Sequence, residues 1–117
     1  MEKSAAVAAL AALAQENRLD VYRLLVQAGA EGMPAGSVAS ELGLAPNTLT
    51  FHFDRLRQAG LVTVRRQGRS MIYAARYDVM NALLGYLTEN CCQGRERAPT
   101  RRRIPAPSAL RRKEKAT

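Results

Sequence analysis

The middle of the chain carries two short amphipathic patterns that a glycine separates. In residues 35–42 the apolar positions recur at i, i+1 and i+4, and Gly43 suits the left-handed end of a helix. A second helix restarts at Pro46, a residue favoured at the first helical position, and ends near Gly60. The spacing predicts these buried positions: Val38, Ala39 and Leu42 on the first helix, and Leu49, Phe53 and Leu56 on the second.

Two β-prone runs follow the second helix. Residues 61–66 and 70–75 are joined around residues 67–69, a connection short enough for a hairpin with Gly68 at its turn. Two helices that meet around a glycine and precede a basic hairpin form the outline of a winged helix-turn-helix that reads DNA. We therefore predict a mainly α fold with a β-hairpin wing.

Amphipathic helices are also predicted near both ends of the pattern. Residues 4–27 are expected to form two helices, and residues 79–92 a last one. The first two are expected to be buried through these residues: Ala5, Ala8, Ala9, Ala12 and Leu13, then Leu19, Tyr22, Leu24, Leu25 and Val26. We expect the terminal helices to pair across a homodimer, because two DNA half-sites one helical turn apart match a two-fold axis.

Charge divides the chain unevenly. Residues 1–92 hold nine Lys and Arg against eight Asp and Glu, a net charge of +1, whereas residues 93–117 hold nine against two, a net charge of +7. The second segment has three prolines and no apolar periodicity, so we predict a DNA-binding, dimerising domain over residues 1–92 and a disordered basic tail over residues 93–117. The tail is either a solvated extension or an arm that binds phosphate without reading sequence.

Residues 7–92 resemble the ArsR/SmtB family of small bacterial repressors. Residues 9–19 are similar to the opening helix pair of that family, residues 48–56 to its recognition helix, and residues 59–62 to the approach to its wing. The resemblance implies a homodimer that occupies operator DNA until a metal or metalloid ion binds and weakens its grip.

The candidate DNA contacts are the polar and basic side chains outside the predicted buried stripe. Asn can pair with adenine edges and Phe can touch a thymine methyl, whereas arginines at a hairpin tip suit phosphate. We expect His52 to pack at the edge of the recognition helix and to bond a neighbour or a phosphate. The predicted contact residues are Asn47, Thr48, Thr50, Phe51, His52 and Arg55 on the helix, and Arg65, Arg66 and Arg69 on the wing.

Two ion-site placements familiar in the family are absent, since residues 35–42 contain no Cys and residues 78–92 contain no His. The only two thiols are Cys91 and Cys92, predicted at the end of the last helix. Soft thiolates favour soft ions, so the expected effector is trivalent arsenic or antimony: arsenite, antimonite or methylarsenite. Arsenite needs a third donor from the partner subunit, whereas methylarsenite already carries one As–C bond. Zinc or cadmium held by four Cys of two subunits, and thiol oxidation, remain alternatives.

Other classes of protein find little support in the sequence. It has one His, no Gly-rich phosphate loop and no persuasive spacing of Ser, His and Asp, so we expect no enzyme and no catalytic cofactor. No run of 18 apolar residues and no signal-peptide pattern occur, so a cytoplasmic location is expected. A nonspecific or architectural DNA-binding protein is the alternative to a repressor.

Overall fold

The computed structural model describes residues 1–94, which fall into a compact unit, Met1–Leu87, and the start of a second unit at Thr88. Most of the predicted basic tail lies outside the described residues. Within residues 1–94, one short 3-10 helix, η1, follows the last α-helix, and none of the helices is long and apolar enough to cross a membrane. The elements are α1 (Lys3–Leu13), α2 (Glu16–Ala28), β1 (Met33–Pro34), α3 (Ala35–Leu42), α4 (Pro46–Gln58), β2 (Val62–Gln67), β3 (Ser70–Ala75), α5 (Tyr77–Thr88) and η1 (Cys91–Gly94).

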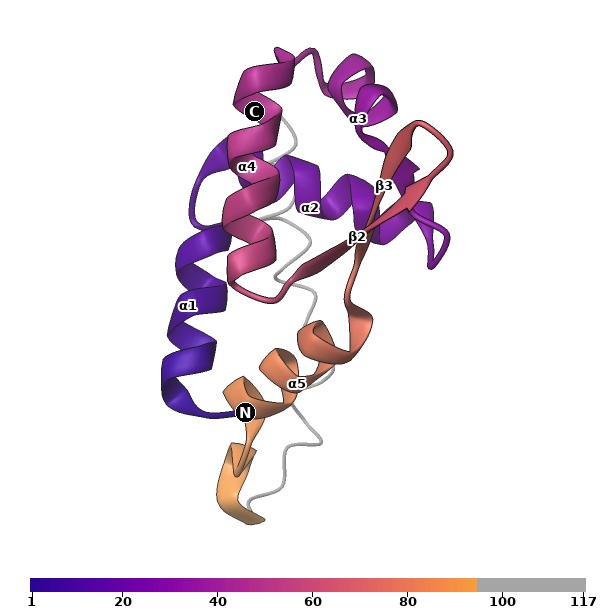
Figure 1. The fold of residues 1–117 in the computed structure, drawn as a ribbon. Coiled ribbons are helices and arrows are strands. Elements are labelled where there is room, and N and C mark those ends of the chain that lie inside the picture. The colour runs from indigo at the N-terminus through magenta and orange to yellow at the C-terminus, as the bar shows by residue number, and fades with distance from the viewer. Residues whose placement is uncertain (95–117) are drawn as a thin grey trace, which may run out of the picture. The chain divides into compact units, whose positions relative to one another are not determined.

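The predicted helix-turn-helix is confirmed as α3 and α4 (Figure 1). Gly43 ends α3 in the left-handed conformation with φ 66°, and the amide of Leu44 donates to the carbonyl of Ala39 at 3.1 Å. Because Pro46 has a fixed φ and needs no amide partner at the first helical position, α4 begins directly after this turn. The short connection fixes the angle at which α4 leaves α3.

The predicted wing is confirmed as the antiparallel pair β2 and β3, which turns at Gly68 with φ 65°. The structure adds a strand that the sequence did not predict. Two-residue β1 pairs with β3, with Met33 opposite Tyr73, so the sheet order is β1-β3-β2. Two residues are too few to show an alternating pattern, which explains why β1 was missed.

The core lies where α4, the sheet and α2 meet. Phe53 of α4 stacks on Tyr73 of β3 with ring centroids 3.6 Å apart, and the predicted positions Leu49 and Leu56 are also buried. The predicted burial of the first two helices is partly wrong, since α1 buries Ala6, Ala9 and Ala12, and α2 buries Val21, Tyr22 and Leu25, while Ala5, Ala8, Leu19 and Val26 are exposed. Helix α1 is so rich in alanine that its pattern cannot identify the inner face.

Helix α5 is anchored at its start and shorter than predicted. The hydroxyl of Tyr77 donates to the carbonyl of Val26 at 2.8 Å, which ties α5 to the end of α2. The helix ends at Thr88 instead of continuing to Cys92, because Asn90 adopts the left-handed conformation with φ 60°. The two cysteines therefore lie in η1 and not in the last turn of α5.

Candidate nucleic-acid interface

Helix α4 presents a polar side to solvent opposite its buried stripe. Asn47, Thr48, Thr50, Phe51 and Arg55 are all exposed, as the spacing of the buried residues requires. The Thr50 hydroxyl donates to the carbonyl of Pro46 at 3.0 Å, so its oxygen can still accept a bond and its methyl can contact a base. All five side chains are therefore accessible to solvent on one helix.

Phe51 is unusual on this surface because it is a large apolar residue that is 52% exposed. Two guanidinium groups lie around it, with the Cζ of Arg55 5.2 Å and the Cζ of Arg18 6.0 Å from the ring centroid. Cation–π attraction of this kind contributes about 0.5–1 kcal/mol at exposed sites. The two arginines therefore restrict the ring and keep an apolar group in the middle of a basic surface.

His52 occupies a different environment from its neighbours on α4. Its side chain is only 5% exposed, which leaves little of its surface for a DNA contact, and it has a neighbouring hydrogen-bond partner, as predicted. The partner is Arg18, whose Nη1 lies 3.4 Å from His52 Nδ1. A guanidinium can only donate, so Nδ1 accepts and the ring is neutral. Burial, and then the charge of Arg18, lower the pKa of His52 below its ordinary value.

Sequence reasoning missed Arg18. Its Nε donates to the carbonyl of Ala12 at 2.6 Å, near the C-terminal end of α1, where helix carbonyls are otherwise unpaired. The same side chain reaches His52 and Phe51 on α4. One arginine thus joins α1, α2 and α4, and the sequence gives no signal for it because its partners are 34 residues away or are backbone atoms.

The wing arginines are exposed but differ in their contacts. Arg65 donates to the carbonyl of Glu31 and to the side chain of Gln67, both at 3.2 Å, and Arg66 donates to the carbonyl of Gly68 at 3.3 Å. Within residues 1–94, the side chain of Arg69 makes no hydrogen bond or ion pair. Each guanidinium carries five N–H donors, so all three keep donors for phosphate.

Cys91 and Cys92 form a second candidate site. Both are exposed and their Sγ atoms lie 3.1 Å apart, longer than the roughly 2.05 Å of an S–S bond, so the pair is a dithiol. Across residues 1–94 no group of three or more His, Cys, Asp or Glu side chains could hold a metal ion. In one copy of the chain, the described residues therefore offer two sulfur donors and no third donor of these types.

Comparison with known proteins shows the family. Residues 13–65 match the model of a helix-turn-helix domain, a span that includes Arg18, α3 and α4. The chain is 30% identical over 98 residues to the transcriptional activator HlyU of Vibrio cholerae, covering 82% of this chain and 88% of HlyU. A solved structure of HlyU from Vibrio cholerae aligns with this structure with a TM-score of 0.62, and the alignment covers 79% of this chain and 99% of the HlyU chain. The chain belongs to the ArsR-like family of winged helix-turn-helix transcriptional regulators.

Two further relatives agree with this assignment. The nodulation protein NolR of Rhizobium meliloti is 33% identical over 80 residues, a match that covers 68% of this chain and 63% of NolR. The solution structure of the homodimeric winged helix-turn-helix domain of Mb0332 from Mycobacterium bovis, at 24% identity, covers 80% of this chain and 87% of that domain with a TM-score of 0.60, and so supports the fold. As a member of this family, the protein is a transcriptional regulator with a DNA-binding fold.

Proposed function

We propose that this regulator is a repressor that binds operator DNA with α4 in the major groove and the wing on the phosphate backbone. The observation that carries the proposal is the exposed side of α4, formed by Asn47, Thr48, Thr50, Phe51 and Arg55, together with a wing that has three exposed arginines. Base-reading and phosphate-binding groups on adjacent elements are the combination that sequence-specific recognition needs.

The test is a binding titration with Asn47→Ala on a duplex selected by the protein from a random pool and on an unselected duplex of equal length. We expect a loss of about 1–3 kcal/mol on the selected duplex and little change on the other. Gln27→Ala, which removes an exposed amide from α2, is the matched control and should bind both duplexes normally. If Asn47→Ala loses the same affinity on both duplexes, Asn47 does not read bases. If the unmodified protein binds both duplexes with equal affinity, a nonspecific DNA-binding protein is favoured instead.

A homodimer is part of the proposal. Helix α1 exposes Val7 and Leu10, and α5 exposes Leu84 and Leu87, each at least 43% accessible. Apolar side chains gathered on two helices of a small protein favour burial against another copy, and the related Mb0332 domain is homodimeric. We expect Leu84→Glu to sediment as a monomer, and Leu19→Glu, at a leucine of α2 that is also exposed, to remain dimeric. A dimeric Leu84→Glu would place the interface elsewhere.

The proposed effector is a trivalent arsenical bound by Cys91 and Cys92. When two sulfurs each lie about 2.3 Å from the same soft ion, the two sulfurs can be no more than about 4.6 Å from each other. The observed separation of 3.1 Å satisfies that limit. With two sulfur donors per chain, the pair suits an ion whose third bond is already made, such as methylarsenite or another monosubstituted arsenical. Only Glu89 and Asn90 separate the thiols from the end of α5, so binding there would act on the helix proposed to form the dimer.

The effector is tested by measuring release of the selected duplex. We expect methylarsenite to release the unmodified protein at lower concentration than arsenite, and Cys91→Ser and Cys92→Ser to bind DNA normally without being released. A better response to arsenite would require a third donor from the partner subunit. Response to cadmium or zinc alone would favour a four-Cys site between subunits, and response to the thiol oxidant diamide alone would favour a redox sensor. A response that survives in the double mutant would overturn the thiol site.

A further inference from the structure

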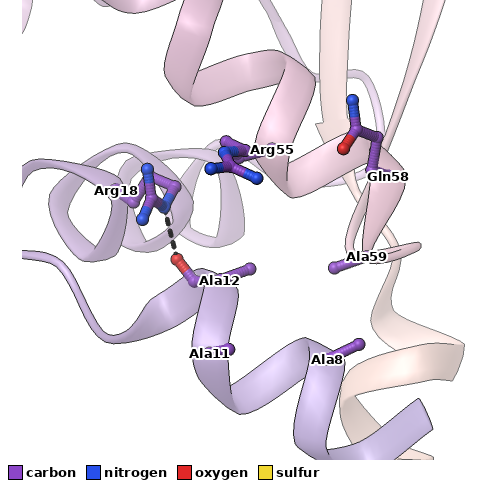
Figure 2. A pocket seen from close by; sticks show the side chains of 7 residues that line it. All are labelled: Ala8, Ala11, Ala12, Arg18, Arg55, Gln58 and Ala59. Atoms are coloured by element: carbon purple, nitrogen blue, oxygen red, sulfur yellow. Dashed lines mark hydrogen bonds between the residues drawn. The ribbon is translucent and has the colours of Figure 1, made fainter. Parts of the chain in front are cut away.

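A small pocket lies between α1 and α4, entirely within the compact unit Met1–Leu87, and has a volume of about 290 Å³ (Figure 2). Ligand pockets span roughly 300–1,000 Å³, so this one suits a compact occupant. Its polar lining consists of Arg18, Arg55 and Gln58. Its apolar wall is made of four methyl groups, those of Ala8, Ala11, Ala12 and Ala59.

The two arginines of the pocket lack a carboxylate partner. The ion pairs within residues 1–94 are Arg57 with Asp54 and Arg76 with Asp78. Arg18 uses donors on the Ala12 carbonyl and on His52. The Arg55 side chain makes no hydrogen bond to any residue that the structure describes. Unused donors of fixed planar geometry therefore line a pocket in which no protein anion is present.

The two guanidinium groups of the pocket also share an aromatic neighbour, Phe51. Both Cζ atoms lie within 6.0 Å of the centroid of the Phe51 ring, and Figure 2 shows both side chains at the same end of the pocket. Like charges beside apolar walls repel each other more strongly than in bulk water, and a bound anion relieves that repulsion. The guanidinium fork matches a carboxylate or phosphate, which it can bind through two parallel hydrogen bonds.

We propose that this pocket binds a small organic carboxylate, with the carboxylate between Arg18 and Arg55 and the hydrocarbon part against the alanine wall. An inorganic anion would use the arginines but leave the methyl groups uncovered, and so gain nothing from the apolar half of the pocket. This site is separate from Cys91 and Cys92, and its existence does not depend on the proposed repressor function.

Occupancy would connect two parts of the protein. The pocket walls belong to α1, which exposes Val7 and Leu10, to α2 through Arg18, and to α4, which carries the proposed base-reading residues. A bound carboxylate would take Arg55 away from a DNA phosphate. By linkage, the carboxylate and DNA would each lower the affinity of the other by the same factor, a consequence that rests on the proposed function.

The inference is tested by following backbone amide NMR signals of the full chain without DNA during titration with benzoate, its neutral isostere benzamide and inorganic phosphate. We expect saturable benzoate shifts on α1 and α4, with affinity at least tenfold lower for benzamide, for phosphate and for the Arg55→Gln variant. Arg57→Gln is the matched control, because Arg57 lies on the same helix, pairs with Asp54 and does not line the pocket. It should bind benzoate normally.

A second variant tests the pocket without removing a charged side chain. Ala11 is exposed, so Ala11→Leu should fill the apolar half of the pocket without disturbing the core, and should block benzoate while leaving the other amide signals in place. Benzoate binding that is absent, or unaffected by both Arg55→Gln and Ala11→Leu, would overturn the proposal. Phosphate binding as tight as benzoate binding would overturn it as well, and would assign the arginine pair to the DNA backbone.

Discussion

His52 is the one histidine of the chain, and its burial makes stability depend on pH. Desolvation, and to a lesser extent the charge of Arg18, lower the pKa of His52 in the folded chain. Just below the ordinary pKa of about 6.5, the unfolded chain therefore binds a proton at His52 more readily than the folded chain does. The stability contributed by the neutral ring is therefore complete above that pKa and declines as the pH falls below it.

We expect the urea midpoint of unfolding to decrease from about pH 7 to about pH 5, and to change less in His52→Gln over the same range. Gln keeps an acceptor for Arg18 but does not titrate. Asp78, whose pKa the Arg76 side chain lowers, titrates below this range and does not interfere. A midpoint that rises toward low pH, or an equal slope in the variant, would contradict this account of His52.

Tyr22 is the other buried polar residue with a clear consequence. Its side chain is 3% exposed, and within residues 1–94 its hydroxyl has no hydrogen-bond partner. A buried unpaired hydroxyl costs about 1–3 kcal/mol. Tyr22→Phe should therefore raise the unfolding free energy by about 1 kcal/mol in chemical denaturation. Tyr77→Phe should have the opposite sign, since it removes the bond to Val26. Destabilisation by Tyr22→Phe would show that the hydroxyl is satisfied.

At the scale of elements, strand β1 depends on Gly32. This residue has φ 77°, and a Cβ there would collide with the backbone carbonyl of Tyr73 on β3. Gly32→Ala should destabilise the protein by more than the roughly 1–3 kcal/mol of backbone strain alone, because the β1–β3 pairing must also open. Denaturant titration measures the effect. Gly36→Ala is the control: it lies within α3 with nothing near the added methyl, and should stabilise by about 0.5–1 kcal/mol. Similar effects from both would contradict the collision.

At the scale of the whole molecule, most of the net positive charge lies outside the compact unit. Residues 93–117 carry a net charge of +7, whereas residues 1–92 carry +1. If the tail binds phosphate, deleting residues 95–117 should reduce the slope of log affinity against log salt by about 0.9 for each phosphate that the tail neutralises. Preference for the selected duplex should persist, because the residues proposed to read bases are on α4. An unchanged slope would make the tail a solvated extension.

The sequence by itself determined the helix-turn-helix and the wing. Spacing of apolar residues predicted α3, α4 and the wing, and it correctly predicted that Asn47, Thr48 and Arg55 are exposed, because a helix with a buried stripe has a defined opposite side. The family resemblance pointed to the same fold. These features are local, so their signals lie within a few turns or one hairpin.

Only the tertiary structure decided those features that depend on contacts between residues far apart in the sequence. Whether His52 is buried, which face of the alanine-rich α1 is inner, and how Arg18 joins three helices all depend on packing between segments far apart in the chain. The pocket between α1 and α4 is lined by Arg18 of α2 and Arg55 of α4, which tertiary packing brings to one site from different helices. The sequence pattern specifies whether a segment forms a helix or a strand, because the two have different periods of apolar residues. Contacts between elements decide which side of a helix faces the core and what surrounds each charged side chain.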